Sequence, residues 1–307
     1  MTATAIFSFC QTERAILHTL LYFEIFSYPL TAQEVFEFAN CPAASADEVS
    51  EKLDGLVAQG VAFHIGRFYL AEPEPAWVSR REDCNRRADA ALPVARRMAR
   101  LIGGFPFVRG VCVSGSLSKH CMSTDSDIDF FIITEPRRLW LARTLLVLFK
   151  KTVLLNSHKY FCVNYFVDTE HLQIEEQNQF TATETATLLP MYGHEWYERF
   201  HAANADWVRA FCPNFPKRAT ADTPPHSRPV LKKMAEWLLG GWLGERLDLW
   251  AMRTTVGFWR RKFPHFDEGE FNVALKSRRH VSKHHPMYFQ QKVLRLLAEK
   301  KARIGEF

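Results

Sequence analysis

The chain has 307 residues, 47% of them hydrophobic and 24% charged, with a formal net charge of +5. These values are ordinary for a globular protein, and the length predicts two or three modules. The most apolar segment, 139–155, carries Arg143, Lys150 and Lys151. It therefore lacks the roughly 18 uncharged residues of a membrane-spanning helix, and we expect no membrane partner.

The seven cysteines are scattered singly, without a C-x-x-C pair or a Cys/His cluster at zinc spacing. The N-terminus lacks the basic and long apolar regions of a signal peptide. We therefore expect reduced thiols in a cytoplasmic protein, with Cys112 and Cys162 as small core residues of strands.

Residues 1–75 predict three helices followed by a hairpin. Apolar residues recur at helical spacing up to the break at Ser27-Tyr28-Pro29, and capping patterns at Thr31 and Ser45 open two further helices. Short apolar runs flank a turn at Gly66-Arg67. This arrangement resembles the winged-helix fold, which implies DNA binding.

The charges of the third predicted helix argue against DNA as the partner. This helix would enter the major groove, yet it carries one lysine, Lys52, against four acids: Asp47, Glu48, Glu51 and Asp54. A phosphate backbone repels such a surface. We therefore expect a structural or protein-contact role for this module.

Residues 76–103 predict a helical connector rich in arginine, in which Pro93 either begins a second helix or kinks the first. Its arginines are Arg80, Arg81, Arg86, Arg87, Arg96, Arg97 and Arg100. Arginine can clamp phosphates, but intervening acids favour a solvated helix face for most of them.

The next segment contains the most informative motif of the chain. An apolar strand, 108–114, runs into Gly115-Ser116, and after a polar excursion a second strand, 127–134, opens with Asp127-Ile128-Asp129. Residues two apart on a strand point the same way, so the two carboxylates should lie side by side with Ile128 in the core. Paired carboxylates favour a divalent cation, and glycine lets a phosphate approach the backbone closely.

This combination resembles the signature of the DNA polymerase β-like nucleotidyltransferase superfamily. The resemblance implies that Gly115 and Ser116 hold the triphosphate of an NTP such as ATP. It also implies that Asp127 and Asp129 bind Mg²⁺, two ions in the two-metal mechanism, with Mn²⁺ as an alternative. Lys119, in the intervening loop, is a candidate phosphate contact, or else an ordinary surface lysine.

A third carboxylate, usual in this superfamily, has no clear counterpart. On the strand predicted over 160–167, the central position is held by Asn164. Asp168 shares its face but lies about 13 Å further along an extended strand. Three interpretations stay open: Asp168 is the third acid in another register, Asn164 assists a site of two carboxylates, or the site binds a nucleotide without efficient turnover.

Residues 104–175 are thus predicted as a nucleotidyltransferase core, with a helix over 137–155 between its strands, and residues 176–307 as a helical region. A capping pattern, Thr181 to Glu184, opens a helix, and 219–229 reads as a linker. From residue 230 a stripe at helical spacing predicts core positions: Trp237, Leu238, Trp242, Leu243, Leu247 and Trp250.

The C-terminal part is basic, with 13 Lys or Arg against 5 Asp or Glu from Arg253 onward. The stretch 276–285 makes nucleic acid a candidate partner, the alternative being a solvated surface. We expect an α+β fold and a Mg²⁺-dependent nucleotidyltransferase acting on the hydroxyl of a small molecule, a protein or an RNA end. The alternative is a non-catalytic nucleotide-binding regulator or scaffold with a degenerate site.

Overall fold

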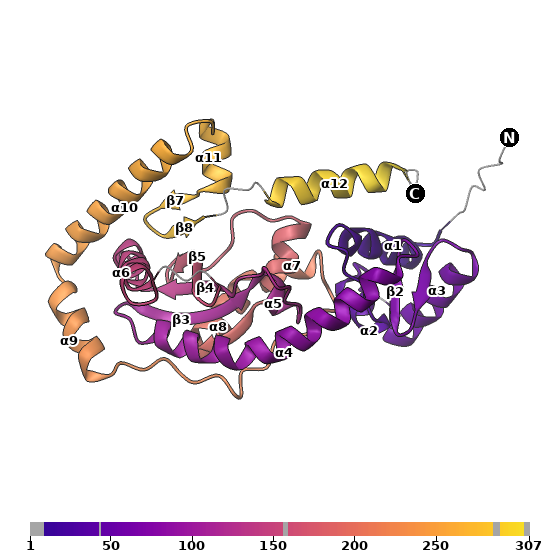
Figure 1. Ribbon diagram of the computed structural model, residues 1–307, viewed down its shortest axis with the longest axis horizontal. Helices are drawn as coiled ribbons and strands as arrows, with labels where there is room; N and C mark the ends of the chain where they lie inside the picture. The colour runs from indigo at the N-terminus through magenta and orange to yellow at the C-terminus, as the bar shows by residue number, and fades with distance from the viewer. Residues whose placement is uncertain (1–8, 43, 156–158, 285–288, 304–307) are drawn as a thin grey trace.

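The computed structural model describes residues 9–42, 44–155, 159–284 and 289–303. Helices and a mixed six-stranded sheet make up the chain, so the predicted α+β class is confirmed. The sheet lies at one end of the molecule, and the N-terminal helices lie at the other (Figure 1).

The N-terminal part contains three helices and a two-stranded antiparallel hairpin, as expected. Its elements are α1 (Gln11–Glu24), α2 (Ala32–Phe38), α3 (Ala46–Ala58), β1 (Phe63–Ile65) and β2 (Phe68–Leu70). Thr31 and Ser45 accept hydrogen bonds from the third backbone amides of α2 and α3, as N-cap residues do. The acids of α3 at 47, 48, 51 and 54 are exposed.

The sheet has the strand order β6-β3-β4-β5-β8-β7. The strands are β3 (Val108–Ser114), β4 (Asp129–Thr134), β5 (Cys162–Asp168), β6 (Leu189–Tyr192), β7 (Ser277–Arg278) and β8 (Val281–Lys283). Only β4 and β5 run parallel, and α6 (Leu139–Thr152) makes the crossover between them. Every other neighbouring pair is antiparallel.

Side chains alternate between the two faces of the sheet and build a core on each. Phe130 and Ile132 pack with α4 (Pro75–Gly103) and α6, whereas Phe131 and Ile133 pack with α7 (Gln179–Thr187) and α8 (His194–Arg209). Cys112, on β3, is fully enclosed in the second core, and Cys162 is half-buried on β5. The site described below lies on the α7 side.

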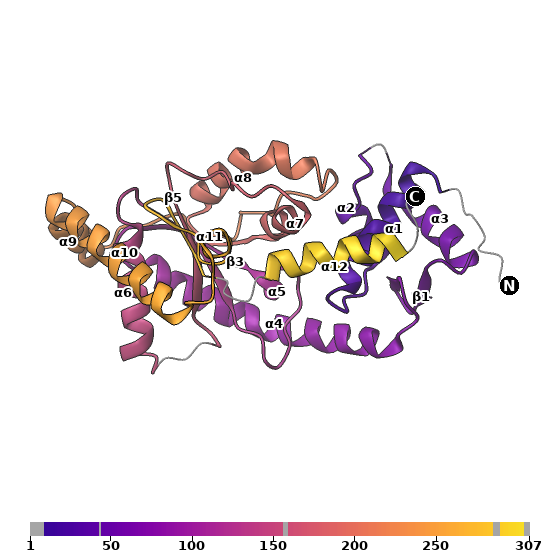
Figure 2. The ribbon, with the colours of Figure 1, turned by 90° about the horizontal axis from the view of Figure 1, so that it is seen from above.

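Two helices join the sheet to the N-terminal part (Figures 1 and 2). The predicted connector is one continuous helix, α4, which runs through Pro93 and packs a row of buried alanines on the sheet. The last helix, α12 (Phe289–Arg303), packs against α1 and α7. Cys212, just beyond α8, completes the N-terminal core.

The region 176–307 is not purely helical, because it supplies β6, β7 and β8. These strands have two to four residues, too few for an alternating pattern, and β6 contains Pro190. Between α8 and α12 it contains the helices α9 (Val230–Leu239), α10 (Trp242–Lys262) and α11 (Glu268–Ala274).

The prediction that the tryptophan stripe of α9 and α10 is core is wrong. Trp237 is 84% exposed, Trp242 69% and Trp250 62%, and Leu238 and Leu243 are exposed as well. Only Leu247 is partly buried against the core. On α9 the polar side faces the protein instead, for reasons given below, whereas α10 turns other apolar residues inward, among them Ala251 and Trp259.

Candidate functional site

The Gly-Ser turn follows β3 directly and forms a short helical turn, α5 (Gly115–Ser118). Gly115 has a φ of +67°, which disfavours any residue with a Cβ. A Cβ placed there would also lie 2.6 Å from Oδ2 of Asp129. Glycine is therefore required on two counts, and this turn touches the second carboxylate of the motif.

Asp127 and Asp129 lie at the start of β4, but only Asp129 belongs to the strand. Asp129 pairs with Ser114 on β3 and with Cys162 on β5. Ile128, between the acids, is fully buried as expected. Burial raises the pKa of Asp129 to about 6, and the negative charge of Asp127 adds to this rise. Both carboxylates are half-buried.

Asn164 reaches the acid pair from a bulge in β5. The register between β4 and β5 shifts at this position, so that Val163 faces Phe130 while Tyr165 faces Phe131. The Nδ2 of Asn164 donates a 2.9 Å hydrogen bond to Oδ1 of Asp129. Its Oδ1 is enclosed and has no hydrogen-bond partner. Bulges commonly redirect a side chain beside an active site.

Lys119 also belongs to this site. Its Nζ donates to the carbonyl oxygen of Gly115 at 3.1 Å and to Oε1 of Glu184 on α7 at 2.7 Å. The hydroxyl of Tyr28, from the N-terminal part, donates to the carbonyl oxygen of Lys119. The turn is thus held by contacts with two distant segments of the chain.

A cavity of about 720 Å³ opens beside these groups. Gly115, Ser116, Lys119, Asp129 and Glu184 line it, and most of its remaining surface is apolar. The aromatic part of the lining comes from several elements: Tyr22, Phe23, Phe26, Tyr28, Phe131, Tyr165, Phe180, Phe200 and Phe289. Its volume falls in the range of small-molecule sites, roughly 300–1,000 Å³.

Asp168 lies away from the acid pair. It pairs with Thr134, at the opposite end of β4 from Asp129 and roughly 17 Å along the strand. Its Oδ1 accepts hydrogen bonds from the backbone amides of Glu170 and His171 and contacts Nδ1 of His171. The predicted third-acid role of Asp168 is therefore not supported, because this carboxylate closes a turn.

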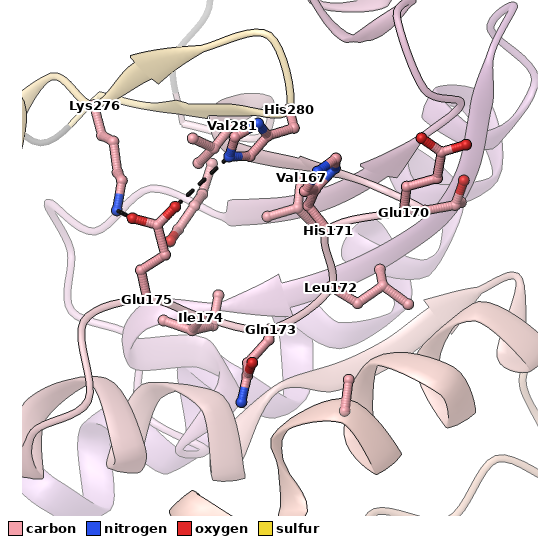
Figure 3. A pocket seen from close by; sticks show the side chains of 13 residues that line it. Val167, Glu170, His171, Leu172, Gln173, Ile174, Glu175, Lys276, His280 and Val281 are labelled. Atoms are coloured by element: carbon pink, nitrogen blue, oxygen red, sulfur yellow. Dashed lines mark hydrogen bonds and ion pairs between the residues drawn. The ribbon is translucent and has the colours of Figure 1, made fainter.

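A second cavity, of about 470 Å³, lies at that other end of the sheet (Figure 3). Glu175 contacts both Lys276 and His280 there, at 2.7 Å and 3.6 Å, and His171 stacks on His280. Arg278 also pairs with Glu175, and Arg279 pairs with Glu245. These basic residues are therefore neutralised within the protein, which weakens the prediction of a nucleic-acid surface.

The basic stretch 276–285 is divided by the β7–β8 hairpin. Arg278 lies at the turn, at the Asp168 end of β5, whereas Lys283 and His284 line the larger cavity near Asn164. The backbone amide of His284 donates to the carbonyl oxygen of Asn164 at 2.9 Å. His285, also in this stretch, lies outside the described residues.

Glu184 is the site residue that sequence reasoning missed. The Thr181–Glu184 pattern predicted a capping box, but α7 begins earlier, at an N-cap formed by Asn178. Glu184 instead pairs with Lys119, and its charge contributes to the raised pKa of Asp129. No pattern in the sequence reveals this role, because Glu184 and Lys119 come together only in the folded protein.

The chemistry of these groups fits a hard divalent cation. A half-buried carboxylate with a raised pKa, a second carboxylate near enough for its charge to contribute to that rise, and an unpartnered amide oxygen are oxygen ligands of the kind Mg²⁺ prefers. Across the described ranges, no group of three His, Cys, Asp or Glu side chains is arranged to hold a metal ion. A cation at this site therefore needs further ligands from water or substrate.

Comparisons with protein-family models, curated proteins and solved structures found no match to this chain. Among the helices that the structure describes, none is long and apolar enough to cross a membrane.

Proposed function

We propose that this chain is a Mg²⁺-dependent nucleotidyltransferase. The observation that carries the proposal is the contact between the Gly115-Ser116 turn and the Asp129 carboxylate at the wall of a cavity. In this reaction the acceptor hydroxyl oxygen attacks the α-phosphorus of an NTP such as ATP. The bond between the α-phosphorus and the oxygen that bridges it to the β-phosphorus breaks, and pyrophosphate leaves. The same proposal assigns 1–75 to a winged-helix-like module and 104–175 to a polymerase β-like core.

Asp127, Asp129 and the Asn164 oxygen would hold the cation. Mg²⁺, or Mn²⁺ in its place, would neutralise phosphate charge and lower the pKa of the attacking hydroxyl. The raised pKa of Asp129 supports this assignment, because its causes, burial first and then the charge of Asp127, both disfavour an ionised carboxylate that has no cation beside it. Asn164 holds the Asp129 carboxylate in place through its amide nitrogen.

The remaining polar groups of the cavity fit roles toward phosphate and proton. The Ser116 hydroxyl would donate to a phosphate oxygen, and Lys119 would place a positive charge beside the turn. Glu184 is the carboxylate best placed to act in the absence of a third acid on β5. It would accept the proton of the acceptor hydroxyl after a phosphate replaces it as the ion-pair partner of Lys119.

The apolar walls favour stacking of a nucleobase or an acceptor with apolar surface. Aromatic side chains from α1, α7 and α12 line the cavity, and base–aromatic stacking contributes about 1–3 kcal/mol per base. An RNA 3′ end is disfavoured as acceptor, because Arg278 and Arg279 are paired with glutamates away from the acid pair.

A second candidate is a non-catalytic regulator or scaffold that binds nucleotide. The observation that favours it is Asn164, a neutral side chain at the position where a third carboxylate would complete the metal site. In that case the same turn and acids bind an NTP with Mg²⁺ but transfer nothing.

A transfer assay with each α-³²P-labelled NTP, Mg²⁺ and cell extract as the acceptor source tests the proposal. Label should reach an acceptor with the unaltered protein and with Asp125→Asn, an exposed acid of the same loop. It should be lost in Asp127→Asn and in Asp129→Asn. Mg²⁺-dependent NTP binding without transfer favours the regulator, and activity in both site variants contradicts the metal assignment.

A further inference from the structure

Helix α9 is amphipathic with its apolar side turned to solvent. Leu231 is 81% exposed, Met234 61% and Trp237 84%, whereas two of its three charged residues, Lys232 and Glu236, are almost fully buried. A helix on a globular protein normally has the opposite orientation. The exposed apolar side is therefore a feature that the fold maintains against the usual hydrophobic gain.

Buried ionic contacts hold α9 in this orientation. The Nζ of Lys232 donates to the carbonyl oxygens of Gly103 and Val108, at 2.7 Å each. Oε1 of Glu236 accepts hydrogen bonds from Nη1 of Arg109, at 2.7 Å, and from the backbone amide of Phe107, at 2.8 Å. Rotating the helix to hide its apolar side would expose or orphan all these groups, which is costly.

Exposed apolar residues continue past the corner between α9 and α10, at residues 240–241, onto α10. Arg138 donates to backbone carbonyl oxygens of Leu239 and Gly241, at 3.1 Å and 3.0 Å, which fixes this corner on the core. On α10 the buried Asp248 accepts a 2.8 Å hydrogen bond from the amide of Leu141. The outward residues of both helices form what we call the α9–α10 face: Val230, Leu231, Met234, Trp237, Leu238, Trp242, Leu243 and Trp250.

The exposed charges of these two helices are basic. Lys233, Arg246 and Arg253 are exposed among or near the apolar residues. Arg261 and Lys262 are exposed at the end of α10, where Arg260 pairs with Glu268. The acids of 230–262 are turned inward or paired: Glu236 and Asp248 are buried, and Glu245 pairs with Arg279 at 2.7 Å. Helices α9 and α10 lie at the end of the molecule opposite α1–α3 (Figures 1 and 2).

We propose that the α9–α10 face docks on the surface of an anionic phospholipid bilayer. Helices that lie in a membrane interface combine tryptophan and leucine on one side with lysine and arginine around it. Tryptophan prefers the headgroup level, and the basic residues match the negative potential of anionic lipids. A second copy of this chain fits less well, because an isologous contact would bring like charges together. The expectation of no membrane partner rested on membrane-spanning segments alone, and docking of this kind needs none.

Flotation with large unilamellar vesicles tests the proposal on the full chain. The protein should bind vesicles of phosphatidylcholine with phosphatidylglycerol and bind pure phosphatidylcholine more weakly, with a blue shift of tryptophan emission. The double variant Trp237→Ser/Leu238→Ser should lose most binding. In Arg246→Glu/Arg253→Glu the affinity for anionic vesicles should fall by roughly tenfold or more. Leu101→Ser, a partly exposed leucine of α4, should bind like the unaltered protein.

Circular dichroism verifies that each variant keeps its fold, since the altered side chains are exposed. Two outcomes overturn the proposal. Absence of binding to both vesicle types assigns the face to a protein partner. A dimer by light scattering that becomes a monomer in Trp237→Ser/Leu238→Ser, without vesicle binding, assigns it to a second copy of the chain.

Discussion

Replacing Asp129 with asparagine is expected to stabilise the metal-free protein while removing its cation site. Burial, with the charge of Asp127 added to it, raises the pKa of Asp129 from 3.8 to about 6. The ionised form of this side chain is therefore less stable in the folded protein than in the unfolded chain. Asparagine removes the charge and can still accept the hydrogen bond from Asn164 through its amide oxygen.

The expected gain in the free energy of unfolding follows from the shift in the pKa of Asp129. Each pKa unit corresponds to about 1.4 kcal/mol, so a rise of about two units costs the folded state roughly 3 kcal/mol once Asp129 is ionised in both states. The folded state binds this proton more tightly than the unfolded state. The cost is therefore absent below about pH 3.8, grows as the pH rises towards about 6 and is complete above it.

Thermal unfolding in EDTA provides the assay. At about 2 °C per kcal/mol, Asp129→Asn should raise the unfolding temperature by roughly 4–6 °C near pH 8 and by little near pH 4. Asp125→Asn, which changes an exposed acid of the same loop, should leave it unchanged. Mg²⁺ with NTP should then stabilise the unaltered protein but not Asp129→Asn. A lower unfolding temperature for Asp129→Asn near pH 8, or an equal gain at both pH values, would refute the reasoning.

Three further predictions concern the supports of the site and of α9. Gly115→Ala should cost about 1–2 kcal/mol of stability from its positive φ and weaken Mg²⁺ binding by displacing Asp129, as measured by thermal unfolding and calorimetry. Tyr28→Phe should cost about 1 kcal/mol and lower transfer, because it removes the donor to the carbonyl oxygen of Lys119. Glu236→Gln should cost about 1–3 kcal/mol in thermal unfolding, because Lys232 loses its nearby carboxylate while Arg109 keeps its ion pair with Glu135; no loss of stability would contradict a structural role for this network.

The strands β3, β4 and β5 were predictable because they are apolar and bounded by recognisable turns. The run 108–114 became β3 without change, and Gly115 took the backbone conformation that a Gly-Ser turn suggests. The position of Asn164 was predictable only in part. The resemblance to the nucleotidyltransferase signature placed it near the acids, but the bulge that directs it to Asp129 is a tertiary feature.

The wrong predictions for Glu184 and Trp237 share a physical cause. In each case a contact with residues distant in sequence decided where the side chain lies. Glu184 fits a capping pattern, yet its partner is Lys119, 65 residues away. Trp237 fits a helical core stripe, yet ionic contacts of Lys232 and Glu236 with the sheet decide which side of α9 faces inward. Periodicity gives the separation of polar and apolar sides, but not which of them the protein covers.

The N-terminal part contributes to the cavity in a way that fits its charges. Tyr28 holds the loop beside the phosphate turn, and aromatic residues of α1 form one wall of the cavity. The acidic surface of α3, which would repel DNA, lies outside that lining. Because α12 ties α1 to α7, α1 and the residues just after it complete the walls of a site whose acids lie at the start of β4. This arrangement supports the structural role that the charges predicted, since removing these walls would open the cavity to water.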